Sequence, residues 1–405
     1  MNQATREFVL QHANDDVRQL ALKKVKNPEI DLPLALDQIK GRQTARTKIP
    51  TWAQHDGILY PSHLSMEQCS SEKTARYKAK LIRQLTDSFA SFIDLTGGLG
   101  VDFSMMASSL PACACVYVEQ QATLCDLASH NFQALGLSNT EVVHADGVEF
   151  LHQLDHATVI FLDPARRDSH GGRTYAIGDC TPDVLLLRNE LLQKADIVML
   201  KLSPMLDWHE AVRQLNREGE CVREVHIVSI GNECKELLLI LGKQEKGKAC
   251  RVVCVNDEES FSFPVAAESA ASSIYRESLG LRMPVSGDYH YETNDSVMKA
   301  GCFMELSATF GVRGLGVNSH LFIADRLMGD FPGRKFQVQA VSSMNKKELQ
   351  EKLQGIGHAN ITTRNFPMRP EEVRHRLKIK DGGEVFIFAT TLYDGTFVLI
   401  ISKKA

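Results

Sequence analysis

The chain has 405 residues, of which 43% are hydrophobic and 24% charged. This composition excludes a disordered, collagen-like or low-complexity protein, and the length exceeds the ~150 residues of one ordinary domain, so we expect several domains with well-buried cores. The formal net charge of −4 is uneven, because residues 331–405 carry 13 Lys and Arg against 7 Asp and Glu, which gives +6 there and −10 elsewhere. A basic segment therefore follows an acidic body.

The sequence predicts neither a membrane span nor a metal site. No apolar run approaches the ~18 residues of a membrane helix, and the first residues have no signal-peptide pattern, so we expect a cytoplasmic protein. Ten cysteines in 405 residues are too dilute for a disulfide scaffold. The close pairs Cys113/Cys115 and Cys250/Cys254 do not match the paired C-x2-C spacing of structural zinc.

The first part of the chain, residues 1–64, predicts helices separated by polar and proline-containing stretches. A further helix is expected within residues 67–85, because Ser70 or Ser71 can cap it and apolar residues recur from Ala75 to Leu85 with helical spacing.

Strands and helices then alternate, which is typical of a parallel sheet. The expected strands are 91–95, 115–119, 140–145, 158–163 and 196–202, and the expected helices begin near 101 or cover 121–135, 184–194 and 207–215. Two more strands, 224–230 and 235–242, are joined by only four residues, so they must pair antiparallel. We expect residues 65–260 to form a doubly wound α/β core whose sheet finishes in a hairpin.

The remaining sequence predicts two smaller parts. Residues 261–330 form a small α+β or connecting domain with a helix near 296–309. Residues 331–405 show the order β-α-β-α-β-β, with strands at 336–344, 360–366, 384–392 and 396–403 and helices at 345–354 and 370–378. This order indicates a small α+β domain that carries the basic charge.

A glycine-rich turn follows the first core strand. Asp94 ends that strand, and the turn contains Thr96, Gly97, Gly98 and Gly100. Such a turn lets the backbone approach a ligand before a helix begins. Two ligands compete: a dinucleotide, whose fingerprint needs a glycine where Phe103 stands, or S-adenosylmethionine, whose amino-acid part would face the loop amides while Asp94 accepts from its ammonium group.

The next two strands also end in acidic residues. Glu119 can accept from both hydroxyls of a ribose, and Asp146, followed by Gly147, stands where an adenine amino group would need an acceptor. Carboxyl ends of parallel strands meet at one edge of a sheet, so Asp94, Glu119 and Asp146 would line one crevice. The alternative is that each acid caps the helix that follows it.

These features resemble the class I S-adenosylmethionine-dependent methyltransferases. The segment DLTGGLGVD, residues 94–102, is similar to their first motif, and Glu119 and Asp146 match the acids of their second and third strands. The hairpin 224–242 is similar to the reversed last strand of their seven-stranded Rossmann-like sheet. The resemblance implies this fold, S-adenosylmethionine as cofactor, and a cofactor site made of Asp94, Thr96, Gly97, Gly98, Gly100, Glu119, Asp146 and Gly147.

The fourth strand ends in the sequence Asp163-Pro164-Ala165-Arg166-Arg167. Methyltransferases that act on nucleobase nitrogens or glutamine amides often carry D/N-P-P-Y/F here, and this segment resembles that motif with Ala165 and Arg166 in place of the second proline and the aromatic residue. The resemblance implies that Asp163 and Pro164 hold the target NH2. Arg166 could stack on a base or hold a phosphate, and Arg167 could help to present the base. We expect these four residues, Asp163, Pro164, Arg166 and Arg167, to be catalytic.

Two further residues are candidates for substrate binding. Arg173 lies in the polar loop after the fourth strand, which could close over substrate or remain a solvated loop. Lys201 falls at the end of the fifth strand, at the same edge of the sheet.

Over nearly its whole length the chain resembles a bacterial methyltransferase family with a C-terminal THUMP-like domain. The residues that carry this resemblance are 67–79, the segment 162–167, NSHLF at 318–322 and 364–383. THUMP domains bind RNA, so the resemblance implies an RNA partner for the basic segment, where Arg364, Arg369 and Arg374 could contact phosphates and Phe366 could stack on a base. Ordinary solvated helix charges are the alternative.

The sequence therefore predicts methyl transfer from S-adenosylmethionine to a nucleobase nitrogen, in ribosomal or transfer RNA. The alternatives are a methyltransferase for a protein amide or a small molecule, a catalytically silent RNA- or protein-binding module on the same fold, and a nicotinamide oxidoreductase.

Overall fold

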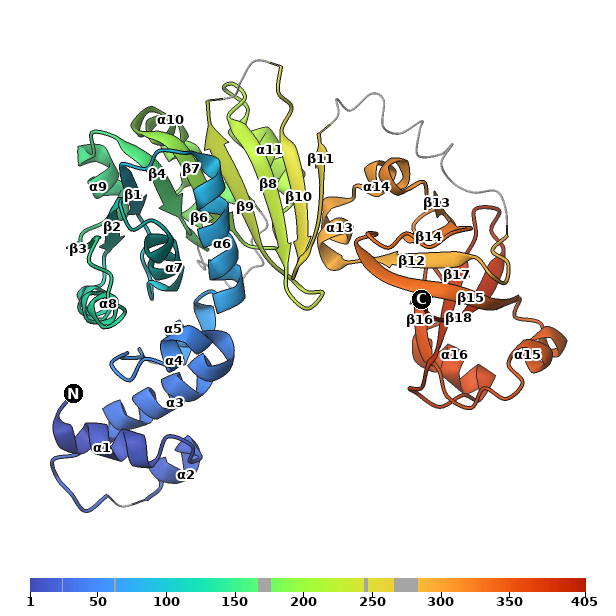
Figure 1. Ribbon diagram of the computed structural model, residues 1–405, viewed down its shortest axis with the longest axis horizontal. Coiled ribbons are helices and arrows are strands. Elements are labelled where there is room, and N and C mark those ends of the chain that lie inside the picture. Colours follow the sequence, from blue (N-terminus) through green and yellow to red (C-terminus); the bar gives the residue numbers. More distant parts are fainter. Residues whose placement is uncertain (24, 62, 167–175, 244–246, 266–282) are drawn as a thin grey trace. The chain divides into compact units, whose positions relative to one another are not determined.

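The computed structural model describes residues 1–23, 25–61, 63–166, 176–243, 247–265 and 283–405. These residues form two compact units, one of residues 1–225 with 235–248 and the other of 226–234 with 249–405 (Figure 1). The four-part division expected from the sequence, with boundaries after residues 64, 260 and 330, stays a prediction. Among the described residues no helix is long and apolar enough to cross a membrane.

The N-terminal part is helical, which confirms the prediction. Its helices are α1 (Gln3–Gln11), α2 (Val17–Ala21), α3 (Leu32–Lys48), α4 (Pro50–Ala53), α5 (His63–Gln68) and α6 (Glu72–Leu85). Polar side chains begin four of them: Asn2, Asp16, Asp31 and Ser71 each accept a hydrogen bond from a backbone N–H of the first turn. The cap of α6 is thus Ser71 rather than Ser70.

The first sheet is doubly wound and parallel over most of its width. Its strands are β1 (Ser91–Asp94), β2 (Ala114–Glu119), β3 (Thr140–His144), β4 (Ala157–Leu162), β7 (Ala195–Leu202), β8 (Val222–Ser229), β9 (Cys234–Gly242), β10 (Arg251–Asn256) and β11 (Glu259–Pro264). They lie in the order β11-β10-β8-β9-β7-β4-β1-β2-β3. Strands β3, β2, β1, β4 and β7 run parallel, and β9 is antiparallel to β7, which confirms the reversed strand.

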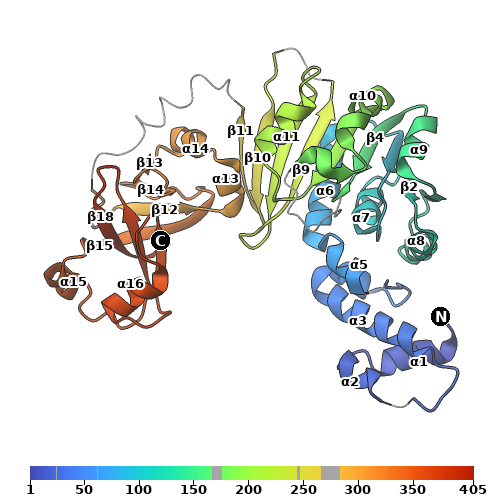
Figure 2. The same ribbon diagram turned by 180° about the vertical axis from the view of Figure 1, so that it is seen from behind.

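This sheet has nine strands where seven were predicted. Strands β10 and β11 add to it, and their apolar residues Val252, Cys254, Phe261 and Phe263 are buried. Five helices connect the parallel strands: α7 (Val101–Ser109), α8 (Ala122–Ala134), α9 (Gly147–Gln153), α10 (Val184–Lys194) and α11 (Trp208–Leu215). Helices α6 and α7 lie on one face of the sheet and α10 and α11 on the other (Figures 1 and 2).

A second sheet of seven strands forms the C-terminal part of the chain. Its strands are β12 (Tyr289–Thr293), β13 (Arg313–Gly314), β14 (Leu321–Ala324), β15 (Gly333–Ser342), β16 (Asn360–Arg364), β17 (Val385–Thr391) and β18 (Phe397–Lys404). They lie in the order β13-β14-β12-β15-β18-β17-β16. With α15 (Lys346–Lys352) and α16 (Pro370–Leu377), the last part has the β-α-β-α-β-β order predicted from the sequence.

The single helix predicted near 296–309 is wrong. Two helices, α13 (Asp295–Ala300) and α14 (Phe303–Phe310), replace it. Helix α13 ends at Gly301, whose left-handed backbone (φ +69°) turns the chain before α14 begins.

Candidate active site

The glycine-rich turn between β1 and α7 is packed tightly against the neighbouring elements. A Cβ atom on Gly97 would lie 2.3 Å from the ring of Tyr117, and one on Gly100 would lie 2.9 Å from Phe132. Gly100 also has a left-handed backbone (φ +81°) at the start of α7. The Tyr117 hydroxyl donates to the Gly98 carbonyl. A Cβ on Gly98 would meet only Thr96 O, at 3.7 Å, so this turn leaves space on one side.

Asp94 places a buried carboxyl group at the end of β1. The residue is 1% exposed, and its Oδ1 accepts from the Thr96 N–H at 2.9 Å and from the Thr96 hydroxyl at 3.3 Å. No ion pair is formed by Asp94 within the described part of the chain. Burial, with the nearby carboxylates of Asp102 and Asp163, raises the pKa of Asp94 to about 8. A cationic ligand beside it would remove this penalty.

Glu119 reaches from the end of β2 to the glycine turn. Its Oε2 accepts from the Gly98 N–H and its Oε1 from the Gln121 N–H, both at 2.9 Å. Each carboxylate oxygen has a second lone pair, so Glu119 retains the capacity to accept from two hydroxyl groups. It does not cap α8, whose first turn is preceded by Gln121.

Asp146 does cap a helix. Its Oδ1 accepts from the Val148 and Glu149 N–H groups at the start of α9, at 2.8 and 3.2 Å. Of the three strand-end acids, Asp146 therefore caps the helix that follows it, whereas Asp94 and Glu119 do not. The adjacent Gly147 packs closely on the end of β1, since a Cβ there would lie 2.2 Å from Leu95 O.

Asp163 and Pro164 follow β4, directly beside β1 in the sheet. The Asp163 N–H donates to Thr96 Oγ1 at 2.7 Å, and that same hydroxyl donates to Asp94. One threonine side chain thus connects the residue predicted to bind cofactor with the residue predicted to bind the methyl acceptor. Pro164 is buried, whereas the Asp163 side chain is 40% exposed and accessible to a ligand.

A chain of alternating charges leads from Asp163 into the protein. Lys201 on β7 lies 2.5 Å from Asp163 Oδ2 and 3.4 Å from Asp102 Oδ2. Lys78 on α6 lies 3.2 Å from Asp102 Oδ1 and 2.6 Å from Glu236 Oε1 on β9. The Lys78 side chain is fully buried. We call Glu236, Lys78, Asp102, Lys201 and Asp163 the charge chain.

Mutual attraction sets the ionisation of Lys201 and Asp102 in the charge chain. Burial alone would lower the pKa of Lys201, but the carboxylates of Asp163 and Asp102 outweigh burial and raise it, so the ammonium group is charged. Burial would raise the pKa of Asp102, but Lys78 and Lys201 lower it. Burial raises the pKa of Glu236 although Lys78 is adjacent.

Sequence reasoning missed three members of the charge chain, Lys78, Asp102 and Glu236, although each left a signal. Lys78 stands three residues after Ala75, on the apolar face of α6, where a lysine is buried only with a partner. Asp102 lies within the glycine-rich motif, and Glu236 interrupts the apolar run of β9. Ser70, considered as a cap, donates to Asp102 Oδ2 at 2.7 Å instead.

The structure describes the remaining predicted site residues of the first unit only in part. The backbone of Arg166 belongs to β5 (Ala165–Arg166), which pairs with β6 (Cys180–Thr181). Arg167 and Arg173 lie outside the described residues, as does half of the loop 168–183, which was expected either to close over substrate or to remain solvated.

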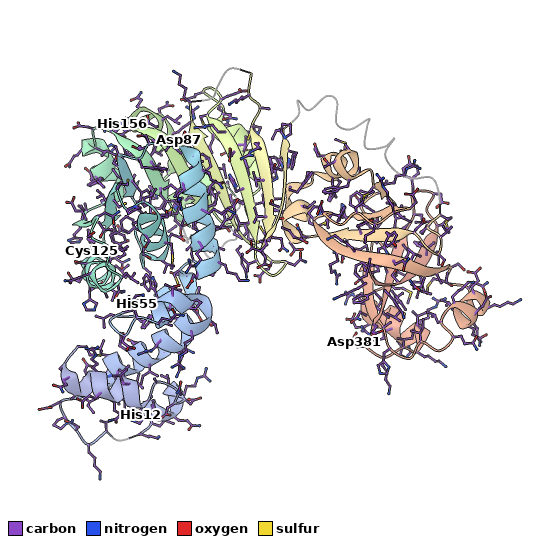
Figure 3. The ribbon with its side chains drawn as sticks, viewed as in Figure 1. His12, His55, Asp87, Cys125, His156 and Asp381 are labelled. Atoms are coloured by element: carbon purple, nitrogen blue, oxygen red, sulfur yellow. The ribbon has the colours of Figure 1, made fainter. Side chains whose placement is uncertain are left out.

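The three arginines of the basic segment that were predicted to bind RNA, Arg364, Arg369 and Arg374, lie in the second unit and differ from one another. Arg364 Nη2 lies 2.8 Å from the buried carboxylate of Glu292, which Arg334 also contacts. Arg374 pairs with Asp381 at 2.5 Å, and Asp381 is labelled in Figure 3. Arg369 is exposed at the start of α16. Of the three, Arg369 is exposed, whereas Arg364 and Arg374 are half-buried.

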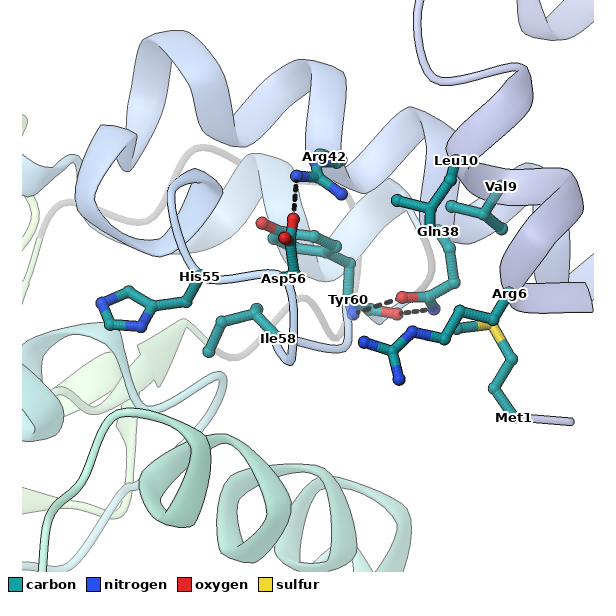
Figure 4. Close-up of a pocket in the computed structure, with 10 residues that line it drawn as sticks. All are labelled: Met1, Arg6, Val9, Leu10, Gln38, Arg42, His55, Asp56, Ile58 and Tyr60. Atoms are coloured by element: carbon teal, nitrogen blue, oxygen red, sulfur yellow. Dashed lines mark hydrogen bonds and ion pairs between the residues drawn. The ribbon is translucent and has the colours of Figure 1, made fainter. Parts of the chain in front are cut away.

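A small cavity elsewhere in the first unit contains none of the predicted site residues. It lies among the N-terminal helices and has a volume of about 20 Å³, enough for about one water molecule. Arg42 pairs with Asp56 beside it, and Gln38 exchanges two hydrogen bonds with the Tyr60 backbone (Figure 4). Among the described residues, no cluster of three or more His, Cys, Asp or Glu could hold a metal ion.

Comparison with known proteins defines the family. Residues 333–404 match the THUMP domain-like family model, and residues 289–332 match a ferredoxin-like domain model. A solved structure named "putative methyltransferase" from Porphyromonas gingivalis W83 is 30% identical, covers 99% of this chain and 98% of that chain, and superposes with a TM-score of 0.83. The chain belongs to this methyltransferase family.

The family is that of class I S-adenosylmethionine-dependent methyltransferases with a C-terminal THUMP-like domain, and the chain is an enzyme of this type. More distant solved structures include a methyltransferase from Agrobacterium tumefaciens, 16% identical over 42% of this chain and 61% of that chain with a TM-score of 0.30. Another, from Listeria monocytogenes, is 11% identical over 61% of this chain and 90% of that chain, with a TM-score of 0.38. No curated protein matches the sequence.

Proposed function

We propose that this methyltransferase transfers the methyl group of S-adenosylmethionine to a nitrogen of a nucleobase in RNA. The observation that carries the proposal is the connection made by Thr96 between Asp94 and Asp163. It supports a cofactor carboxylate and an acceptor carboxylate held in one site, at the adjoining ends of β1 and β4. Such fixed positioning is the main requirement for a displacement between two bound reactants.

The residues at this edge fit a cationic adenosyl cofactor. The buried Asp94 carboxyl group would accept from the ammonium group of the methionine part, and the turn of Thr96, Gly97, Gly98 and Gly100 would face that part with its backbone. Glu119, with lone pairs still available, would accept from the ribose hydroxyls. The second oxygen of Asp146 would accept from the adenine amino group, and the close packing of Gly147 keeps α9 near β1. Bound S-adenosylmethionine supplies a methyl group on a sulfonium, which is a good leaving group.

The acceptor nitrogen would be oriented by Asp163. Its carboxylate accepts an N–H of the amine, so that the nitrogen lone pair is directed away from the carboxylate and toward the methyl group. The Lys201 ammonium group lies 2.5 Å from Asp163 Oδ2, and a carboxylate paired in this way accepts hydrogen bonds and donates none. Buried Pro164 fixes the backbone beside it. Arg166, Arg167 and Arg173 are proposed to hold the RNA chain near this carboxylate.

The basic C-terminal domain supports RNA as the partner. THUMP domains bind RNA, and residues 333–404 match the THUMP domain-like model. The segment has a net charge of +6, and on and beside α16 the side chains of Arg369, Arg376, Lys378 and Lys380 are exposed. Phe366 packs edge-on against Phe397, which is 46% exposed, so an aromatic surface lies within this basic segment.

The test uses the full-length enzyme with tritium-labelled S-adenosylmethionine. Total RNA and total protein from cells that lack the gene are offered as separate acceptors, and label is measured in each fraction. We expect label in RNA and none with the Asp163→Ala variant. Label in the protein fraction alone would contradict RNA as the substrate.

A further inference from the structure

The ammonium group of Lys201 has one more N–H donor than it has acceptors among the described residues. An ammonium group has three N–H donors and no acceptor. Two of these donors are directed to Asp163 Oδ2 at 2.5 Å and Asp102 Oδ2 at 3.4 Å, and no third acceptor is recorded for this lysine among the residues the structure describes. Its side chain is 13% exposed and belongs to the same strand-end edge as Asp163.

The charge chain holds this ammonium group in place. Asp102 is fixed by three groups: Lys201, Lys78 at 3.2 Å and the Ser70 hydroxyl at 2.7 Å. Lys78 is itself held by both oxygens of Glu236, at 2.6 Å each. A lysine that only neutralised Asp163 would not need such a buried support, whereas a recognition group must keep one position.

We infer that Lys201 is the second recognition group of the acceptor site. Asp163 accepts from the target amino group, and Lys201 donates to an acceptor atom next to it, so that the pair selects adenine or cytosine and rejects guanine. This inference rests on the proposed function, because it concerns which nucleobase the same site methylates.

The hydrogen-bonding edges of the bases explain the selection. The amino group of adenine has ring-nitrogen acceptors beside it, and the amino group of cytosine has one. On the Watson–Crick edge of guanine, the ring position next to the amino group is an N–H donor. The ring nitrogen on the other side of the amino group lies next to the ribose. Since Lys201 is a donor only, a guanine N–H facing it would leave two donors opposed and unpaired. A site that hydrogen-bonds its substrate rejects an analogue that cannot complete those bonds.

The decisive measurement is the identity of the methylated nucleoside. RNA from cells that lack the gene is labelled by the wild-type enzyme with tritiated S-adenosylmethionine, digested to nucleosides and separated by chromatography. We expect the label in methylated adenosine or cytidine. Label in guanosine or uridine would overturn the inference while leaving RNA methylation intact. Label only in protein, or in neither fraction, would overturn the proposed function and the inference together.

Variants of Lys201 test its role directly. Lys201→Met removes the donor, and we expect kcat/KM for RNA to fall by about 10-fold to 100-fold, the usual effect of losing a hydrogen bond from a charged group. Lys201→Gln restores a donor and adds an acceptor, so the share of label in guanosine should rise above the wild-type share. A share that stays at the wild-type value would contradict base recognition by Lys201.

A lysine of similar burial provides the matched control. Lys194 on α10 is 21% exposed and pairs with Glu190, away from the charge chain. Lys194→Met should leave both kcat/KM and the labelled nucleoside unchanged. An equal loss in Lys194→Met and Lys201→Met would assign the effect to general destabilisation and would count against the inference.

Discussion

At the scale of single residues, the ionisation of Asp94 predicts how cofactor binding depends on pH. Burial raises the pKa of this carboxyl group to about 8 in the free enzyme, so the group is largely neutral at lower pH. A cationic cofactor binds the ionised form, and binding therefore releases a proton. Below about pH 8 the affinity should fall by up to about tenfold per pH unit. Isothermal titration calorimetry with S-adenosylmethionine between about pH 6 and about pH 9 measures this dependence.

The Asp94→Asn variant is the control for this prediction, because its side chain does not titrate. Its cofactor affinity should be low and nearly independent of pH. The stability of the free enzyme should depend on pH in the opposite direction. Because the pKa of Asp94 is higher in the folded state than the ordinary value of 3.8, the contribution of this group to the free energy of unfolding is complete below about pH 3.8. It is lost as the pH rises to about 8. Melting curves of the wild-type enzyme and of Asp94→Asn at several pH values measure this dependence. An Asp94→Asn enzyme whose stability changed with pH as steeply as that of the wild type would contradict the assignment.

The close packing of Gly97 gives a second residue-scale prediction. In Gly97→Ala the new methyl group would meet the Tyr117 ring at 2.3 Å, so the turn must move or Tyr117 must rotate. Overpacking of this kind costs about 1–3 kcal/mol, and because the turn is the proposed cofactor cradle we expect affinity for S-adenosylmethionine to fall by about 10-fold or more. Gly329→Ala, at a glycine with no atom within 4 Å, is the control and should bind normally.

Residue types and their order predicted the strand-end acids, but not how each oxygen is used. Asp94, Glu119 and Asp163 stand where the order of strands placed them, because residues at the ends of parallel strands meet at one edge. That Asp146 caps α9 depends on the local backbone after β3. The pairing of Lys201 with Asp102 joins residues 99 positions apart, and sequence spacing carries no information about such a contact.

At the scale of elements, the buried pair of Lys78 and Glu236 joins α6 to β9. The Lys78 side chain is fully buried and that of Glu236 is 4% exposed. Removing Lys78 leaves the buried Glu236 carboxyl group, whose pKa burial already raises, without its partner. We therefore expect Lys78→Met to lower the free energy of unfolding of this unit by about 3–5 kcal/mol, measured by urea denaturation followed by tryptophan fluorescence, since Trp52 and Trp208 both lie in it.

A double variant distinguishes the pair from general packing. Lys78→Met combined with Glu236→Leu removes both charges, and apolar replacement of a buried ion pair is often neutral. The double variant should recover most of the stability that Lys78→Met loses. Its kcat/KM should nevertheless be lower than that of the wild type, because Asp102 no longer has Lys78 beside it. Additive losses from the two substitutions would show that the pair is not coupled.

Element prediction succeeded where the hydrophobic period was clear and failed where a local turn decided. The strands of the parallel core are short apolar runs, and β4 is buried along its whole length. The alternating pattern of β11, with Phe261 and Phe263 buried, was visible in the sequence. No local feature of the sequence indicated that the antiparallel pair of β10 and β11 would extend the first sheet. The apolar pattern of 296–309 runs through both α13 and α14, and only the left-handed backbone at Gly301 separates them.

At the scale of the whole molecule, the basic charge of the C-terminal domain is divided between structural and exposed residues. Glu292 on β12 is buried and holds Arg334 and Arg364. Because Glu292 falls in the ferredoxin-like match and both arginines fall in the THUMP domain-like match, these ion pairs stabilise the junction of the two. Arg364 therefore contributes to folding of the second unit, and the exposed residues on and beside α16 remain as the proposed RNA contacts.

Charge reversal at the exposed residues gives the last prediction. In Arg369→Glu/Arg376→Glu/Lys378→Glu, phosphate contacts are lost and repulsion replaces them, so RNA affinity should fall and its dependence on salt should weaken. Each lost contact reduces the slope of log K against log salt by about 0.7 for single-stranded RNA. Filter binding of total RNA at several salt concentrations measures both. The control Lys346→Glu/Lys347→Glu/Lys352→Glu makes the same charge change on α15, where all three lysines are also exposed. A shared, equal loss would indicate attraction by net charge, whereas a loss confined to the α16 variant would place RNA on that helix.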